Sequence, residues 1–196
     1  VMGTYFMNAF GLKGENILRT GIPRTDFFYN ENVKENVFNR LTKENPLLWD
    51  KKVILYAPTY RDNELNEFQM ELDLKKLYDE LHEEYVVLLR LHPAIKNVPD
   101  YSKMYPNFVL NYSSPHYDIN ELLIVADILI TDYSSISYEF SLLRKPMIFF
   151  AYDLAEYTRD RGLWDRYENM VPGPVVKNTE AIIDLIKENS FDMDMI

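Results

Sequence analysis

Short apolar runs alternate along the chain with segments in which apolar residues recur every three or four positions. The apolar runs end at turn residues, which is typical of buried strands. They lie at 16–20, 52–57, 85–91, 107–111, 127–131 and 146–151. The helix-spaced segments lie at 32–41, 72–85, 119–125, 134–143 and 179–188, the last with Thr179 as its expected N-cap. The chain is therefore expected to alternate between strands and helices.

The predicted strands are continuous apolar runs rather than alternations of apolar and polar residues. Continuous runs are typical of a parallel sheet that helices cover on both faces, so the expected fold class is α/β with a Rossmann-like sheet. No repeat or linker divides the sequence, and we expect residues 1–196 to form a single domain with a loose tail at 189–196. In such sheets ligands bind outside the carboxyl ends of the strands.

Composition and charge exclude several classes of protein. The 196 residues carry a formal net charge of −10, which argues against nucleic-acid binding, and the absence of cysteine excludes disulfides and thiolate metal sites. No Walker A loop, G-x-G-x-x-G motif or acidic pair suited to a metal occurs. The longest apolar run, 122–130, is too short for a transmembrane helix. The opening segment, 1–11, is typical of the middle of a protein, so we expect the chain to belong to a longer one.

Four polar segments follow predicted strands, at 21–24, 58–61, 90–93 and 131–135. Because the carboxyl ends of parallel strands meet at one edge, these segments are expected to converge. Together they supply arginines, hydroxyl groups and one imidazole, which is the chemistry of a phosphate-binding crevice.

Ser134 and Ser135 follow the strand at 127–131 and open a predicted helix. Free backbone N–H groups and the helix dipole favour phosphate there, and two hydroxyls add donors. The alternative is that Ser134 only caps the helix. Glu139 lies four residues beyond Ser135 on the same helix face and can accept hydrogen bonds from ribose or polyol hydroxyls. Its alternative is a solvated carboxylate.

Arg90 lies at the end of the apolar run at 85–91 and His92 follows it, and the turn after them is expected to bring both to a ligand. His92 can donate a hydrogen bond to phosphate or transfer a proton. His82 and His116 lack such a setting and are expected on a helix surface and in a loop.

Arg24, Tyr60 and Arg61 each allow a simpler explanation. Arg24 can be a solvated surface residue, and Tyr60 and Arg61 can belong to a charged loop. Four independent simple explanations, one at each strand end, are less expected than a single binding site that all four segments share.

Taken together, the segments form a recognisable set. They read ILRTGIPRTD, ILYAPTYRDN, LLRLHP, ILITDYSSISYEF, KPMIFFAYDLAEY and RGLW. The set resembles the CDP-glycerol glycerophosphotransferase family of teichoic acid polymerases and primases, from about residue 16 to 186. The resemblance implies a GT-B fold of two Rossmann-like halves, with this chain as the C-terminal, donor-binding half. It implies donor contacts at Arg24, Thr59, Tyr60, Arg90, Leu91, His92, Ser134, Ser135 and Glu139, with His92 also catalytic.

The resemblance implies transfer of glycerol phosphate from CDP-glycerol to a hydroxyl of a teichoic-acid-type polymer or primer, with release of CMP and no cofactor. The other catalytic histidine of the family, and the surfaces for polymer, lipid-linked primer and membrane, belong to the N-terminal half. This chain alone is thus expected to be inactive. The expected location is cytoplasmic, on the inner face of the cell membrane.

Three alternatives remain open from the sequence. The donor can be CDP-ribitol, which relatives use. The chain can belong to a GT-B sugar-nucleotide glycosyltransferase or epimerase. A non-catalytic receiver-like module is less favoured, because the strand ends carry Arg, His and Ser rather than an acidic cluster.

Overall fold

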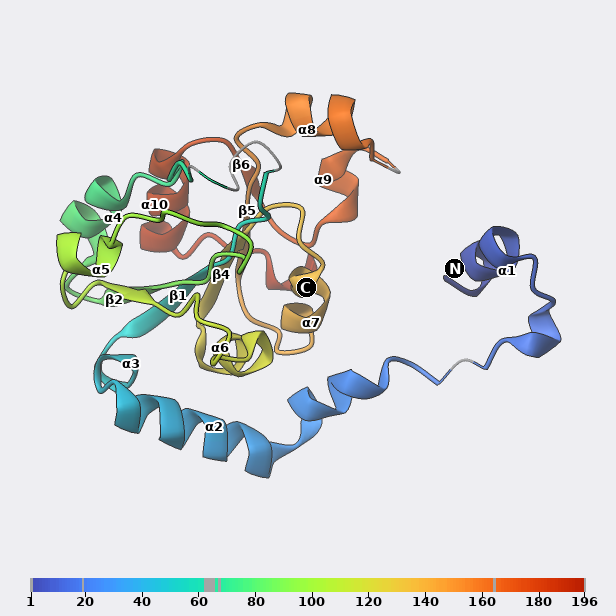
Figure 1. Ribbon diagram of the computed structural model, residues 1–196, viewed down its shortest axis with the longest axis horizontal. Coiled ribbons are helices and arrows are strands. Elements are labelled where there is room, and N and C mark those ends of the chain that lie inside the picture. Colours follow the sequence, from blue (N-terminus) through green and yellow to red (C-terminus); the bar gives the residue numbers. More distant parts are fainter. Residues whose placement is uncertain (1, 19, 62–65, 67, 164, 196) are drawn as a thin grey trace.

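A six-stranded parallel sheet with the strand order β3-β2-β1-β4-β5-β6 forms the centre of the protein (Figure 1). The computed structural model describes residues 2–18, 20–61, 66, 68–163 and 165–195. The strands are β1 Lys52–Tyr56, β2 Tyr85–Leu89, β3 Val109–Asn111, β4 Ile128–Thr131, β5 Met147–Phe150 and β6 Val175–Val176. This is the strand order of Rossmann folds, so the predicted fold class is confirmed.

The continuous apolar runs arise because the sheet is covered on both faces. Successive strand residues point to opposite faces. In β1, Val53 and Leu55 accordingly lie in one hydrophobic core, whereas Ile54 and Tyr56 lie in the other. The alignment of the strands is fixed at the centre of the sheet, where Ile54 is opposite Val87 of β2 and Ile128 of β4.

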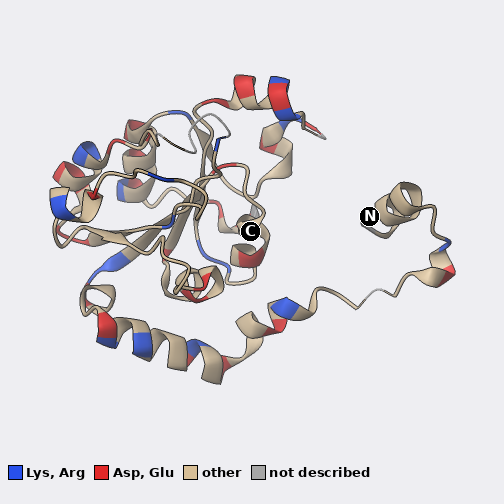
Figure 2. Cartoon of the chain, viewed as in Figure 1, with Lys and Arg blue, Asp and Glu red and all other residues tan. Residues whose placement is uncertain are grey.

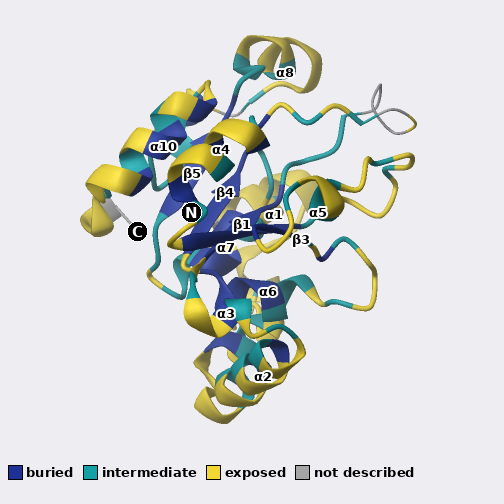
Figure 3. Cartoon of the chain, turned by 90° about the vertical axis from the view of Figure 1, so that its left-hand side faces the viewer, coloured by how far each residue is buried: buried dark blue, intermediate teal, exposed yellow. Residues whose placement is uncertain are grey.

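Helices form two layers, one on each face of the sheet. The α-helices are α1 Met2–Phe10, α2 Glu31–Glu44, α3 Leu47–Asp50, α4 Leu74–Leu81, α5 Tyr101–Met104, α6 Ile119–Val125, α7 Ile136–Ser141, α8 Leu154–Arg161, α9 Tyr167–Met170 and α10 Thr179–Glu188. Helices α2 and α6 contribute Leu41 and Leu122 to one core, and α4 and α10 contribute Leu77 and Ile182 to the other. Figure 3 shows the buried strands between these two layers.

The outer surfaces of the helices carry the charge. In Figure 2, acidic and basic residues are interspersed along α2 and α8. Within the parts of the chain that the structure describes, no helix has the length and apolar character needed to cross a membrane.

The prediction of a strand at 16–20 is wrong. Asn16 ends a short 3-10 helix, η1 Gly14–Asn16, and residues 17, 18 and 20 have no regular structure, while Arg19 lies outside the described residues. Leu18 is exposed rather than buried. A strand needs a neighbour to satisfy its backbone groups, and Figure 1 shows this part of the chain and α1 apart from the sheet.

The N-cap of helix α10 is not the residue that the sequence predicted. Asn178, not Thr179, is the N-cap, and its side chain accepts a hydrogen bond from the Ala181 N–H. Thr179 is buried, and its hydroxyl accepts a hydrogen bond from the Asp73 N–H. Both residue types can cap helices. Here the Thr179 side chain is turned to the start of α4, where it bonds the N-cap residue Asp73, and Asn178 caps α10 instead.

Candidate functional site

The carboxyl ends of β1, β2 and β4 bring three of the predicted polar segments to the same edge of the sheet. The Arg90 N–H donates to the Tyr56 carbonyl at 2.9 Å, which places the segments after β1 and β2 side by side. The Thr59 N–H donates to Asp132 Oδ1 at 2.8 Å, which joins the segment after β1 to that after β4. The fourth segment, around Arg24, reaches this edge through a side chain rather than through a strand.

Tyr60 and His92 form a ring pair at the edge, with centroids 4.6 Å apart. The Ala94 N–H donates to His92 Nδ1 at 3.2 Å, so in the neutral imidazole Nδ1 is the acceptor and the proton sits on Nε2. This tautomer is assigned from the hydrogen bond. His92 is exposed, and its Nε2 has no partner among the described residues. His92 therefore presents a hydrogen-bond donor to any ligand above it.

Arg90 and Leu91 hold the loop that follows β3. Arg90 Nη1 donates to the carbonyls of Tyr112 and Ser114, each at 3.0 Å, and the Leu91 N–H donates to Ser113 Oγ at 2.9 Å. Burial lowers the pKa of Arg90, which nevertheless stays a cation at neutral pH. The Leu91 side chain is buried in the core. A ligand could thus reach the remaining guanidinium N–H groups of Arg90 but not the side chain of Leu91.

Ser134 and Ser135 precede α7, which begins at Ile136, two residues later than predicted. Ser134 Oγ accepts from the Ile136 N–H at 3.4 Å. This hydrogen bond is longer than usual, so Ser134 caps the helix only weakly. Ser135 is exposed, and its side chain makes no capping hydrogen bond. A pocket of about 260 Å³ lies beside both serines and is also lined by Tyr133 and Tyr157.

Glu139 is buried on α7, so the solvated carboxylate that we gave as its alternative is wrong. Arg24, from the 3-10 helix η2 Pro23–Tyr29, donates to Glu139 Oε1. A buried carboxylate needs a partner, and Arg24 is its side-chain partner among the described residues. Two residues predicted to contact one ligand therefore contact each other.

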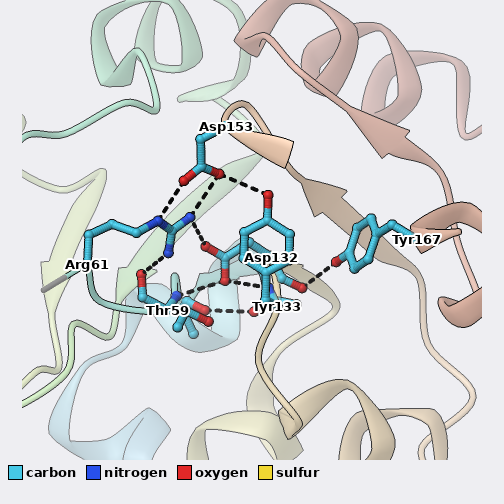
Figure 4. Close-up of polar contacts among 8 residues, drawn as sticks. Thr59, Arg61, Asp132, Tyr133, Asp153 and Tyr167 are labelled. Atoms are coloured by element: carbon cyan, nitrogen blue, oxygen red, sulfur yellow. Dashed lines mark hydrogen bonds and ion pairs between the residues drawn. The ribbon is translucent and has the colours of Figure 1, made fainter. Parts of the chain in front are cut away.

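The sequence did not single out Asp132 and Asp153, and it placed Arg61 either among the cations of the shared crevice or in a charged loop. Asp132 is buried after β4, and its Oδ1 accepts from the N–H groups of Thr59 and Tyr133 at 2.8 and 2.7 Å (Figure 4). Arg61 donates to both aspartates. It is therefore part of a buried ionic network, not of a charged loop. The only signal in the sequence was the position of these residues directly after predicted strands.

The described residues contain no group of three or more His, Asp and Glu side chains arranged to hold a metal ion. Hydrogen bonds and ion pairs hold the network around Arg61 together. The Thr59 hydroxyl is buried there and forms no hydrogen bond with the described residues.

A parallel sheet in Rossmann order, with arginine, serine and histidine side chains at its carboxyl edge, defines a Rossmann-like α/β protein. The chain belongs to the CDP-Glycerol:Poly(glycerophosphate) glycerophosphotransferase family, whose model matches residues 1–195. The family predicted from the sequence motifs is thereby confirmed.

Named relatives and solved structures agree with this family. The chain is 44% identical over 195 residues to the teichoic acid poly(ribitol-phosphate) polymerase of Bacillus spizizenii, covering 98% of this chain and 31% of that protein. It is 42% identical to the teichoic acid glycerol-phosphate primase of Bacillus subtilis, covering 95% and 46%. The wall teichoic acid polymerase TagF superposes with a TM-score of 0.82 at 36% identity, covering 98% and 47%. The chain thus spans about a third to a half of these relatives.

Proposed function

We propose that the chain binds a CDP-polyol at the carboxyl edge of its sheet and serves transfer of glycerol phosphate from CDP-glycerol to a hydroxyl of a teichoic-acid-type polymer or primer. The observation that carries the proposal is the family match over residues 1–195. The position of Tyr60, His92, Ser134 and Ser135 around the ends of β1, β2 and β4 supports it. The chain would form the donor-binding half of a GT-B enzyme.

The reaction requires stabilisation of negative charge on the donor diphosphate. An acceptor hydroxyl oxygen attacks the β-phosphorus, the bond from that phosphorus to the bridging oxygen breaks, and CMP leaves. Arg24, Arg90 and the hydroxyl of Ser135 would stabilise the negative charge that develops. The Nε2–H of His92 would donate to the leaving oxygen. The base that takes the acceptor proton is expected from the N-terminal half of the enzyme.

Glu139 has one carboxylate oxygen bonded to Arg24. This contact would hold the Arg24 guanidinium towards the donor, and the second oxygen would accept a hydrogen bond from a ribose or polyol hydroxyl. In this arrangement the carboxylate is screened from the diphosphate by the arginine that it binds.

CDP-ribitol is the second candidate donor, because the 44% identical relative is a poly(ribitol-phosphate) polymerase. Parallel calorimetric titrations of the chain with CDP-glycerol, CDP-ribitol and UDP-N-acetylglucosamine test both candidates. We expect one CDP-polyol to bind at least tenfold more tightly than the UDP-sugar. Equal or tighter binding of the UDP-sugar would instead assign the chain to a sugar-nucleotide enzyme.

The acceptor and the location follow from the same proposal. A teichoic acid chain or lipid-linked primer would approach the donor from the other half of the enzyme. The reaction would take place on the cytoplasmic side, with the enzyme peripheral to the inner face of the membrane.

A further inference from the structure

Arg61 lies at the centre of the buried network that joins three strand ends (Figure 4). Its Nε and Nη2 donate to the two carboxylate oxygens of Asp153 at 2.7 and 3.0 Å. Nη2 also donates to Asp132 Oδ2 at 3.0 Å, and Nη1 donates to the Thr59 carbonyl at 2.6 Å. The side chain is 11% exposed. These contacts occupy the guanidinium on three sides.

Three tyrosine rings surround the same guanidinium. Its central carbon lies 5.2 Å from the ring centroid of Tyr133 and 5.5 Å from those of Tyr152 and Tyr157. Rings at this distance attract a cation. Tyr133 also donates its hydroxyl to Asp153 at 2.9 Å and stacks on Tyr157 at 3.6 Å. The rings leave Arg61 enclosed, so a ligand would not reach it directly.

Burial and ion pairing act in opposite directions on the charged groups of the network. Burial works to lower the pKa of Arg61, but the hydrogen bond to Asp153 and the charge of Asp132 outweigh it, so the pKa is raised. Burial raises the pKa of Asp132, and Arg61 opposes that shift. The Arg61 charge and two backbone N–H groups favour the ionised form of the Asp132 carboxylate.

We propose that Arg61 is a positioning residue of the donor site, an inference that rests on the proposed function. Arg61 holds the Thr59 carbonyl, and through Asp132 it holds the Thr59 N–H and the Tyr133 N–H. Thr59 precedes Tyr60, the ring partner of His92, and Tyr133 precedes the serine pair. One guanidinium thus fixes the distance between the segment after β1 and the segment after β4, which would both bind the diphosphate.

The planar fork of arginine is essential to this role. It binds Asp153 in a bidentate manner while reaching Asp132 and the Thr59 carbonyl. A lysine keeps the charge but presents a single ammonium, which cannot make all of these contacts in the same geometry. Arg61→Lys therefore removes the positioning function while preserving a buried cation.

The first measurement compares CDP-glycerol affinity, or CDP-ribitol affinity if that is the donor bound, in wild type, Arg61→Lys and Lys145→Met. Lys145 is a matched control, because it is a half-buried cation that donates to backbone carbonyls, those of Ile124 and Ala126, but at the opposite edge of the sheet. We expect Arg61→Lys to weaken the donor at least tenfold and Lys145→Met to stay within twofold of wild type. Equal affinities in the three proteins would overturn the inference.

The second measurement needs no ligand. Hydrogen exchange reports the backbone N–H groups of Thr59 and Tyr133, both bonded to Asp132. In Arg61→Lys we expect these amides to exchange at least tenfold faster, while the Val87 amide in the central sheet keeps its protection. Unchanged protection of Thr59 and Tyr133 would overturn the inference. Failure of the wild type to bind either CDP-polyol would instead overturn the proposed function, so the two failures are distinguishable.

Discussion

Arg24 and Glu139 form an ion pair between the segment that precedes the sheet and helix α7, across 115 residues of sequence. The pair is asymmetric, because the Arg24 side chain is 66% exposed and that of Glu139 is 8% exposed. Glu139 therefore needs Arg24 to satisfy its buried carboxylate, whereas water can solvate the Arg24 guanidinium if Glu139 is replaced. This asymmetry determines what each substitution does.

Arg24→Ala leaves a buried carboxylate without its side-chain partner among the described residues. We expect a loss of about 1–3 kcal/mol in the free energy of unfolding, the range for an unsatisfied buried group. The double variant Arg24→Ala/Glu139→Gln should recover part of that loss, because a neutral amide is less costly to bury. Urea denaturation of the four proteins in the cycle measures the coupling. Strictly additive losses would show that the pair has no energetic role.

His92→Ala is expected to weaken binding of the CDP-polyol donor about tenfold or more, because it removes a hydrogen bond to a charged phosphate. The matched control is His82→Ala. His82 follows α4, and its ring stacks on Tyr78 with centroids 4.4 Å apart, at the opposite edge of the sheet. Calorimetry should find His82→Ala within twofold of wild type. An equal loss in both variants would argue for a general effect on folding.

Tyr112 should make the protein sensitive to alkaline pH. Burial, with the charges of Tyr117 and Glu44, raises the pKa of Tyr112 to about 12. A folded-state pKa raised above the unfolded value of about 10 gives stability that is complete below pH 10 and is lost as the pH rises towards 12. Relative to wild type, Tyr112→Phe should therefore gain about 2 kcal/mol between pH 10 and 12. A constant difference across that range would contradict the prediction.

Gly173 is expected to resist substitution because β6 begins close to β5. A Cβ at this position would lie 2.7 Å from the Met147 carbonyl oxygen and 3.3 Å from the Phe149 ring. Gly173→Ala should lower the free energy of unfolding by about 1–3 kcal/mol, the usual effect of overpacking. Gly14→Ala is the control, because its Cβ would meet only Met7 Sδ at an ordinary 3.7 Å. Thermal melting of both variants decides the matter.

The fold was largely predictable because its signals are local. Strands β1, β2, β4 and β5 are buried on both faces and appear as continuous apolar runs, and α6 occupies 119–125 as predicted. Strand β6 has two half-buried residues, Val175 and Val176, which is too short a segment to give a pattern. The apolar run at 16–20 gave a false strand, because nothing in a local pattern tells whether a neighbouring strand is available.

The site was predictable only where sheet topology determines it. Polar segments after parallel strands must meet at one edge, and this placed Tyr60 near His92. The ion pairs at this edge could not be predicted from the sequence, because Arg61 and Asp153 are 92 residues apart and no local spacing connects them. The same holds for Arg24 and Glu139. Whether these residues bind a CDP-polyol stays a prediction.

The central claim is that the donor binds at the carboxyl edge of the sheet. A larger pocket, of about 490 Å³, lies at the opposite edge and is lined by Lys52, Glu84, Tyr85 and Lys187 among others. That pocket has ammonium and carboxylate groups but neither arginine nor serine, so we expect it to bind no diphosphate.

Backbone amide chemical shifts recorded during a CDP-glycerol titration distinguish the two edges directly. The account predicts that the largest changes fall at 59–60, 90–92 and 134–135, and that amides around Lys52 and Tyr85 stay unchanged. The same result with CDP-ribitol would establish the same site for the other donor. Changes concentrated around Lys52 and Tyr85, or no changes with either CDP-polyol, would contradict the account.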